Sequence, residues 1–174
     1  MKQVIAATAA AILGLAPSAV FYAAQANAST VPSCVPGDIA AHIHSIGNAA
    51  GSEYFNLNFT NERKFTCKIS GFPLAYFTNS QKKLITPGAH HEGPSKSVTL
   101  PPQGHAGVQY QVGDPYNYGT VCKPEKSAYM LIVAPGPGPE HGLNYRVQKI
   151  EVCTQIPPQK DGYPYHITSF SPGK

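Results

Sequence analysis

The stretch that decides the fold is FNLNFTN at residues 55–61, in which large apolar and polar residues alternate without interruption. Successive side chains of a β-strand point to opposite faces of the sheet. Phe55, Leu57 and Phe59 therefore face one side, while the Asn and Thr residues between them face the other. This pattern predicts a strand that lies between a hydrophobic core and water.

The same alternation continues outward along the chain. Cys67 and Ile69 form the next inward face, and Gly71-Phe72-Pro73 ends that strand. Further short apolar or alternating runs, separated by segments rich in Gly, Pro, Asn and Asp, lie at 39–43, 74–77, 84–85, 97–100, 106–112, 129–134, 143–147, 149–154 and 166–170. No helical period is sustained after residue 28. Roughly eight to ten short strands in one domain predict an all-β, two-sheet β-sandwich of immunoglobulin-like architecture.

The N-terminus has the form of a secretory signal peptide. Lys2 supplies a positive charge, residues 4–24 are almost wholly apolar, and Ala26 and Ala28 suit a signal peptidase. We expect cleavage after Ala28, so that residues 1–28 are the signal peptide and residues 29–174 a single secreted domain. The mature protein is then secreted, or remains associated with the cell wall, and has no stable membrane span.

Two alternatives for this region stay open. The apolar run is longer than is usual in a signal peptide, so it could remain uncleaved and anchor the chain in a bilayer. Alternatively, small residues precede Cys34 in Val31-Pro32-Ser33-Cys34, which loosely resembles the motif of lipoproteins. Pro32 is unusual in that motif.

The cysteines indicate two disulfides. All four of them, Cys34, Cys67, Cys122 and Cys153, lie after the predicted signal peptide. An even number in an exported chain implies a disulfide framework. Three pairings are possible, and we favour Cys34–Cys67 with Cys122–Cys153. Each bond would then close a loop of about thirty residues, worth roughly 3–4 kcal/mol of stability.

Charge and spacing exclude several classes of protein. The net charge is +4, and no run of Lys or Arg is longer than two residues. The chain therefore carries no basic patch of the kind that binds nucleic acid or a membrane surface. The absence of a C-x-x-C pair argues against a zinc ribbon and against a thioredoxin-type redox site.

Four local features together resemble a known family. They are Phe59-Thr60-Asn61 at the end of one strand, TCKISGFP at residues 66–73, LPPQG at residues 100–104, and the order of the cysteines. The resemblance is to exported actinobacterial proteins, the domain of unknown function 4232 family, over roughly residues 34–170. It implies a secreted protein or lipoprotein with a β-sandwich, and it implies no catalytic residue. The chain departs from common members in its PGPGP loop at residues 135–139 and in lacking Trp.

Histidines are the candidate metal ligands. His42 and His44 lie two residues apart on a predicted strand, so their rings share a face, as metal ligands can. With one further loop histidine they could hold Zn²⁺ or Cu²⁺. The strand alternation places both rings on the solvent side, however, and no nearby carboxylate completes a site. We therefore expect no cofactor, and an exported metal-binding protein is the alternative function.

Catalytic motifs are incomplete. Ser80-Gln81-Lys82-Lys83 matches S-x-x-K, but it falls in a predicted turn, and S-D-N and K-T-G are absent. The nine acidic residues are scattered, without the paired spacing that glycosidases need. We expect that the protein is not an enzyme. A hydrolase in which a Ser, a His and an acid converge only in space is a third hypothesis.

Two tyrosine-rich loops are the candidate binding surface. Tyr116 and Tyr118 lie in residues 114–119, and Tyr163 and Tyr165 lie in residues 161–166; both loops also contain Pro and Gly. Rigid Tyr side chains with a polar tip suit recognition of sugars, peptides or protein surfaces. The alternative is that these rings pack over the sandwich edges as part of the core. The expected function is a non-enzymatic module that binds an envelope or extracellular protein or glycan.

Overall fold

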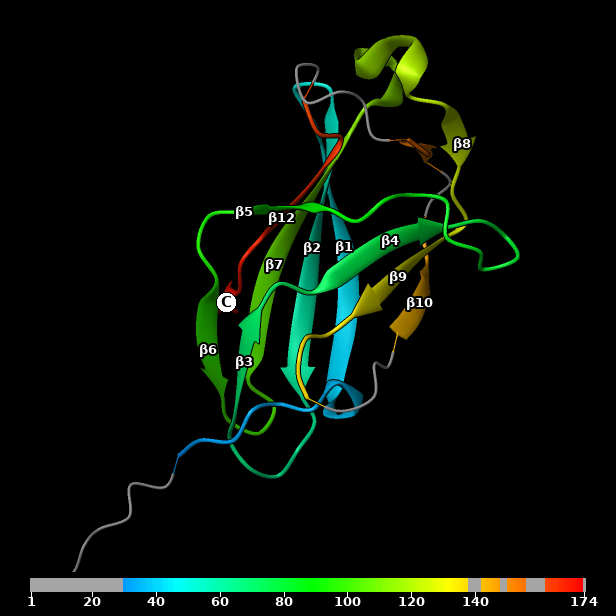
Figure 1. Cartoon of the computed structure of the whole chain (residues 1–174). Coiled ribbons are helices and arrows are strands. Elements are labelled where there is room, and N and C mark those ends of the chain that lie inside the picture. Colours follow the sequence, from blue (N-terminus) through cyan, green and yellow to red (C-terminus); the bar gives the residue numbers. More distant parts are fainter. Residues whose placement is uncertain (1–29, 138–141, 148–149, 156–161, 174) are drawn as a thin grey trace, which may run out of the picture.

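The computed structural model describes residues 30–137, 142–147, 150–155 and 162–173, and it confirms the all-β prediction (Figure 1). The predicted signal peptide, residues 1–28, lies outside the described residues. The strands, in chain order, are β1 (Ile39–Ala49), β2 (Ser52–Asn61), β3 (Cys67–Gly71), β4 (Leu74–Thr78), β5 (His90–Glu92), β6 (Lys96–Leu100), β7 (His105–Gly113), β8 (Pro124–Lys126), β9 (Tyr129–Val133), β10 (Gly142–Arg146), β11 (Glu151–Cys153), β12 (Tyr165–Thr168) and β13 (Ser171–Pro172). Two 3-10 helices, η1 (Pro36–Asp38) and η2 (Pro115–Val121), complete the described elements.

The strands form two packed layers. The large sheet has the order β1-β2-β7-β12-β5, and β13 also pairs with β7. Figure 1 shows β4 and β9 of a second sheet, ordered β10-β9-β4, crossing in front of β1 and β2. Shorter pairs, β3-β6 and β11-β8, extend the structure. Pairing of β5 with β12 is parallel, whereas the other pairs of named strands are antiparallel.

The core lies between these layers and follows the predicted inward faces. Phe55, Leu57 and Phe59 are at most 3% exposed. The ring of Phe55 lies 6.2 Å from that of Phe77 on β4, centroid to centroid, so the two sheets are in direct contact. Tyr110 of β7 is also fully buried. Removing each such side chain from water stabilises the fold by about 1.5–3 kcal/mol.

Both disulfides have the favoured pairing, Cys34–Cys67 and Cys122–Cys153. The sulfur that the lipoprotein alternative would need on Cys34 is thus bonded to Cys67, and that alternative is wrong. Structural disulfides of this kind persist in oxidising compartments outside the cytoplasm. In the part of the chain that the structure describes, no helix is long and apolar enough to cross a membrane.

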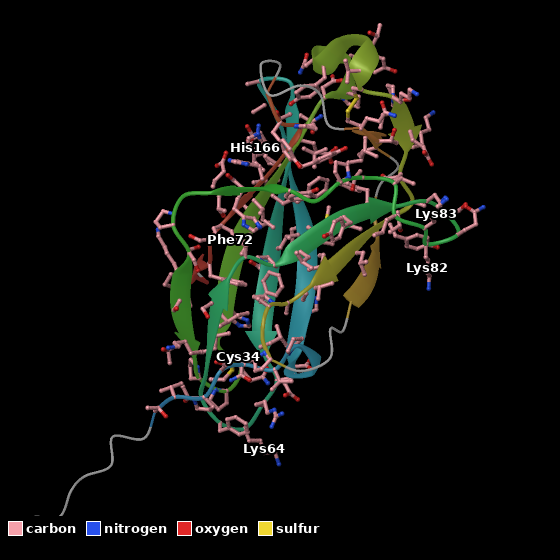
Figure 2. All side chains as sticks on the ribbon, viewed as in Figure 1. Cys34, Lys64, Phe72, Lys82, Lys83 and His166 are labelled. Atoms are coloured by element: carbon pink, nitrogen blue, oxygen red, sulfur yellow. A yellow bond between two sulfur atoms is a disulfide. The ribbon has the colours of Figure 1, made fainter. Side chains whose placement is uncertain are left out.

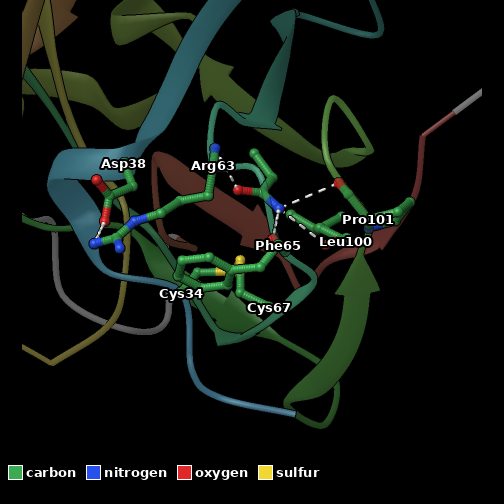
Figure 3. The surroundings of a disulfide bond; sticks show 8 residues. Cys34, Asp38, Arg63, Phe65, Cys67, Leu100 and Pro101 are labelled. Atoms are coloured by element: carbon green, nitrogen blue, oxygen red, sulfur yellow. Dashed lines mark hydrogen bonds and ion pairs between the residues drawn. A yellow bond between two sulfur atoms is a disulfide. The ribbon is translucent and has the colours of Figure 1, made fainter.

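A buried asparagine organises the chain around the first disulfide (Figure 3). The side-chain nitrogen of Asn61, which is fully buried, lies within 3.0–3.2 Å of the carbonyl oxygens of Phe65, Leu100 and Pro101. Its side-chain oxygen accepts a 2.9 Å hydrogen bond from the backbone nitrogen of Arg63. One amide therefore ties the β2–β3 turn to the β6–β7 turn, which gives the TN and LPPQG segments a structural role.

Strand β5 lies between the predicted runs at residues 84–85 and 97–100, where no strand was expected. The strand contains only His90, His91 and Glu92, and none of them carries an apolar signal. It is held by contacts from distant segments: His91 stacks on Phe72 at 4.1 Å between centroids, and Glu92 Oε1 lies 2.9 Å from Nδ1 of His166. Strands of this kind are set by tertiary context and not by propensity.

Candidate functional site

A cavity lies at one end of the sandwich, between three segments that are distant in sequence. It has a volume of about 430 Å³ and is lined by residues 48–53, 112–116 and 150–151. We call it the loop-end pocket. The first segment is the tight turn between β1 and β2, where Ala50 and Gly51 both have positive φ, 48° and 72°. Such turns match the right-handed twist of the strands that they join.

Hydrogen bonds fasten this turn to the first tyrosine loop. The carbonyl oxygen of Gly51 accepts from the backbone nitrogen of Asp114 at 2.9 Å and from the side-chain nitrogen of Asn117 at 3.0 Å. A Cβ on residue 51 would lie 2.6 Å from that Asn117 nitrogen, so any other residue would displace this side chain. Asp114 also caps η2, because its side chain accepts from the backbone nitrogen of Tyr116.

Tyr116 and Glu151 form the polar contact of the pocket. Tyr116 is 70% exposed, and its hydroxyl donates a 2.8 Å hydrogen bond to Oε2 of Glu151. That bond to a carboxylate raises the pKa of the Tyr116 phenol, so the phenol stays protonated at neutral pH. Glu151 lies on β11 two residues before Cys153, whose disulfide partner Cys122 directly follows η2. The second disulfide thus holds donor and acceptor together.

The charged residues that line the pocket are all acidic. Its lining includes the three acidic residues Glu53, Asp114 and Glu151, and no Lys or Arg is among the lining residues. The nearest cation by strand register is Lys126, which is paired with Glu151 across β8 and β11. A ligand that carries donors or a positive charge matches this lining better than an anion does.

The two tyrosine loops meet beside the pocket. Tyr118 packs against Gly113, where a Cβ would lie 2.1 Å from the phenol oxygen. Its hydroxyl donates to the carbonyl oxygen of Tyr163 at 3.4 Å, and the Tyr163 hydroxyl donates to the carbonyl oxygen of Gly88 at 2.9 Å. Burial raises the pKa of both phenols. Both rings are partly buried against the core, and their hydrogen bonds fix the two loops in place.

Tyr165 departs from the predicted surface role. Its side chain is fully buried, and its hydroxyl donates a 2.5 Å hydrogen bond to the carbonyl oxygen of Cys153. The ring stacks near that of Tyr110, with 6.4 Å between centroids. Tyr165 belongs to the core, as the alternative interpretation proposed, because its position on β12 directs it between the sheets. Of the four candidate tyrosines, Tyr116 is the one with a largely exposed ring.

The candidate metal ligands lie elsewhere, on the outer face of the large sheet. His42 and His44 are exposed and line a separate groove together with His105. Within the described ranges, no three His, Cys, Asp or Glu side chains are placed to hold a metal ion.

The S-x-x-K tetrapeptide is confirmed as part of a turn. It follows β4, and the side-chain oxygen of Asn79 accepts from the backbone nitrogens of Gln81 and Lys83, both at 3.0 Å. Figure 2 shows Lys82 and Lys83 at the tip of this exposed loop, far from the other labelled residues. The Ser80 and Lys83 pair thus lies on a turn and not one helical turn apart.

The sequence analysis missed Glu151 and the β1–β2 turn as parts of the site. A signal for Glu151 was present, because the favoured Cys122–Cys153 pairing brings residues near 151 close to the loop that carries Tyr116. The β1–β2 turn had no such signal, because it reaches the first tyrosine loop only through the pairing of β2 with β7. Register places Ser52 opposite Gly113, the residue at which the tyrosine loop begins.

Comparison with known proteins agrees with the motifs. No curated protein matches the chain. The model of one family, described as Domain of unknown function (DUF4232), matches residues 34–155. The match begins at the first cysteine of the first disulfide, ends two residues after the last cysteine, and includes the Tyr116–Glu151 contact. It covers most of the chain, which therefore belongs to the DUF4232 family.

Proposed function

We propose that this protein is an exported, non-enzymatic binding module that takes its ligand in the loop-end pocket. The observation that carries the proposal is the exposed Tyr116 ring, held by Glu151 at the mouth of a cavity that three separate segments build. Loops fixed on a rigid β scaffold are where binding residues concentrate. The second disulfide and the Tyr118–Tyr163 contact supply that rigidity, which lowers the entropy lost on binding.

The lining favours a ligand with a positively charged or donor-rich group. A cation beside the Tyr116 ring would gain cation–π attraction, and the carboxylates of Asp114 and Glu151 would accept its hydrogen bonds. We propose a Lys or Arg side chain on an extracellular or envelope protein as the group that enters the pocket. Two disulfides, together with the expected signal peptide, support action outside the cytoplasm.

Binding to a short peptide that contains Lys and Arg tests the proposal. Residue-resolved NMR titration of the oxidised protein should show shifts at residues 48–53, 112–116 and 150–151. Tyr116→Ala should weaken binding at least tenfold, which is about 1.4 kcal/mol. Glu151→Gln removes the charge but keeps an acceptor for Tyr116, so a loss there reports charge recognition and not the position of the ring.

Lys82→Ala is a matched control, since it changes an exposed side chain on a loop outside the pocket lining. A thermal melt of every variant verifies that the fold is intact. A pull-down from envelope material is then used to identify the natural partner. Equal recovery of every bound protein by wild type, Tyr116→Ala and Glu151→Gln would remove the loop-end pocket as the binding site.

A further inference from the structure

A second concave surface lies on the outer face of the large sheet, away from the loop-end pocket. It is a groove of about 220 Å³ lined by His42, His44, Asn58, Thr60, His105 and Gly173. We call it the outer groove. Its residues come from β1, β2 and β7 and from the segment that follows β13. None of these residues belongs to the lining of the loop-end pocket.

Strand register explains why these side chains gather on one face, since residues directly opposite in neighbouring strands point the same way. One row runs His42, Asn58, Gly107 and Ser171 across β1, β2, β7 and β13. The adjacent rows on the same face are Thr60 with His105, and His44 with Asn56 and Gln109. The face is therefore continuous over three long strands.

The chemistry of this face is polar, and its positions on β1, β2 and β7 carry no Asp, Glu, Lys or Arg. Besides Ala40, Ala49, three glycines and the histidines, the positions of β1, β2 and β7 on this face carry Asn, Gln, Ser, Thr or Tyr, namely Ser52, Tyr54, Asn56, Asn58, Thr60, Gln109 and Gln111. Amides and hydroxyls each provide both a donor and an acceptor. Sugar hydroxyls have the same dual character, so a neutral glycan can pair with such a face without leaving a charge desolvated.

Gly107 leaves the middle of the face open. A glycine inside a strand often marks a place where another group approaches the backbone closely. An added Cβ at Gly107 would meet only the Asn58 side-chain oxygen at 3.5 Å and the Ser171 hydroxyl at 3.9 Å, which are ordinary contacts. The strand would thus accept a side chain here, and its absence keeps room above the sheet.

One imidazole of the groove is held in place by the sheet. Nδ1 of His105 lies 2.8 Å from the hydroxyl oxygen of Thr60, its register partner on β2. This bond fixes the ring plane and leaves Nε2 for another partner. A side chain fixed in this way loses little freedom on binding.

We propose that the outer groove binds a segment of a neutral oligosaccharide. Asn58, His42 and His105 hydrogen-bond its hydroxyls, and the chain of sugars continues over Gly107 toward Tyr54. From Thr60 to Tyr54 the face extends for about 20 Å at a rise near 3.3 Å per residue, which accommodates several sugar units. The outer groove shares no lining residue with the loop-end pocket, so each of the two binding proposals can be disproved without affecting the other.

NMR titration with maltohexaose, cellohexaose and the hexamer of N-acetylglucosamine tests the proposal. At least one of them should shift the resonances of His42, Asn58, Gly107 and His105 at millimolar concentration. Gly107→Val fills the face and Asn58→Ala removes an amide; each should weaken binding at least tenfold. Gly107→Ala should have a smaller effect, and Tyr116→Ala should have none.

Gly107→Val also separates binding from folding, because valine favours strands and its Cβ would meet only side-chain atoms. Its melting temperature should stay within a few degrees of the wild type. The proposal is overturned if none of the three oligosaccharides moves these resonances. It is equally overturned if Zn²⁺ alone or inorganic phosphate alone does so, since those results assign the histidines to a metal or an anion.

Discussion

The two ends of the sandwich use the same covalent device for different purposes. Each has one disulfide, and the two bonds span nearly equal stretches of chain, 33 and 31 residues. At the Cys34–Cys67 end, the amide of Asn61 fills the space between two turns and the nearby cavity is only about 140 Å³. At the Cys122–Cys153 end, the cavity is about 430 Å³ and a tyrosine stands exposed at its edge.

The difference lies in where the polar groups find partners. Around Asn61, carbonyl oxygens from distant turns are satisfied inside the protein, so this end is closed. Around Glu151, the hydrogen bond of Tyr116 forms at the surface, beside a cavity that Asp114 also lines. A disulfide by itself therefore indicates stability and not function. The residues beside the disulfide decide whether that end of the sandwich is closed by internal hydrogen bonds or presents a binding surface.

Removing the disulfides should have the largest effect and test this comparison directly. Loop length predicts that Cys34→Ala/Cys67→Ala and Cys122→Ala/Cys153→Ala each lower the free energy of unfolding by about 4 kcal/mol. Only the second pair should also weaken binding to the loop-end pocket, measured in the cold where both variants are folded. An equal loss of binding in the folded Cys34→Ala/Cys67→Ala variant would contradict the division between the two ends.

Asn61→Ala should be the most damaging single substitution at the closed end. It leaves buried carbonyl oxygens without a donor and should lower the free energy of unfolding by about 3 kcal/mol in urea titrations. Asn58→Ala, on the same strand but on the outer face, is the control and should change it by about 0.5 kcal/mol or less. Similar values for the two variants would show that the Asn61 contacts add nothing to stability.

Tyr110→Phe should have a smaller effect, and in the stabilising direction. The Tyr110 hydroxyl is buried, and no described residue gives it a hydrogen-bond partner, so its removal should raise stability at pH 7 by about 1 kcal/mol. Burial raises the pKa of this phenol well above its usual range. The protonated form therefore favours the folded state.

The preference of the folded state for the protonated Tyr110 phenol is fully present below the pKa of an unfolded tyrosine, about 10. It is lost as the pH rises from there toward the raised pKa of Tyr110 in the folded protein. Circular dichroism melts between neutral and strongly alkaline pH should show a shallower alkaline decline for Tyr110→Phe than for wild type. Tyr165→Phe is not an equivalent control, because its hydroxyl has a partner in the carbonyl of Cys153. A steeper decline for Tyr110→Phe would show that the phenol is not buried as described.

Tyr116→Phe should have the smallest effect on stability. Its hydrogen bond to Glu151 is exposed, so the melting temperature should not differ measurably from that of the wild type. Binding should still weaken, because the ring loses the contact that positions it over the pocket. A large loss of stability would show that Tyr116 has a structural role and does not belong to the binding surface.

Much of this architecture could be read from local pattern. The alternation at residues 55–61 fixed the inward face of β2, and the same period-two rule correctly placed Cys67 and Ile69 inward and His42 and His44 outward. Strand β5 could not be predicted, because its three polar residues are held by Phe72 and His166, which lie far away in sequence. Tyr163 and Tyr165 show the same limit, since one of these two similar residues is partly buried against the core and the other is fully buried in it.

The sequence by itself determined the β class, the oxidising compartment expected from four cysteines, and the family, because each of these depends on local order along the chain. Only the tertiary structure decided that Glu151 meets Tyr116, that Tyr165 is buried, and that His42, Asn58 and His105 share a groove. The physical reason is that the alternation of apolar and polar residues determines which face of a strand is buried. It does not determine strand order and register, which decide which strands become neighbours. Binding surfaces are made by those neighbours, so they follow from packing and not from pattern.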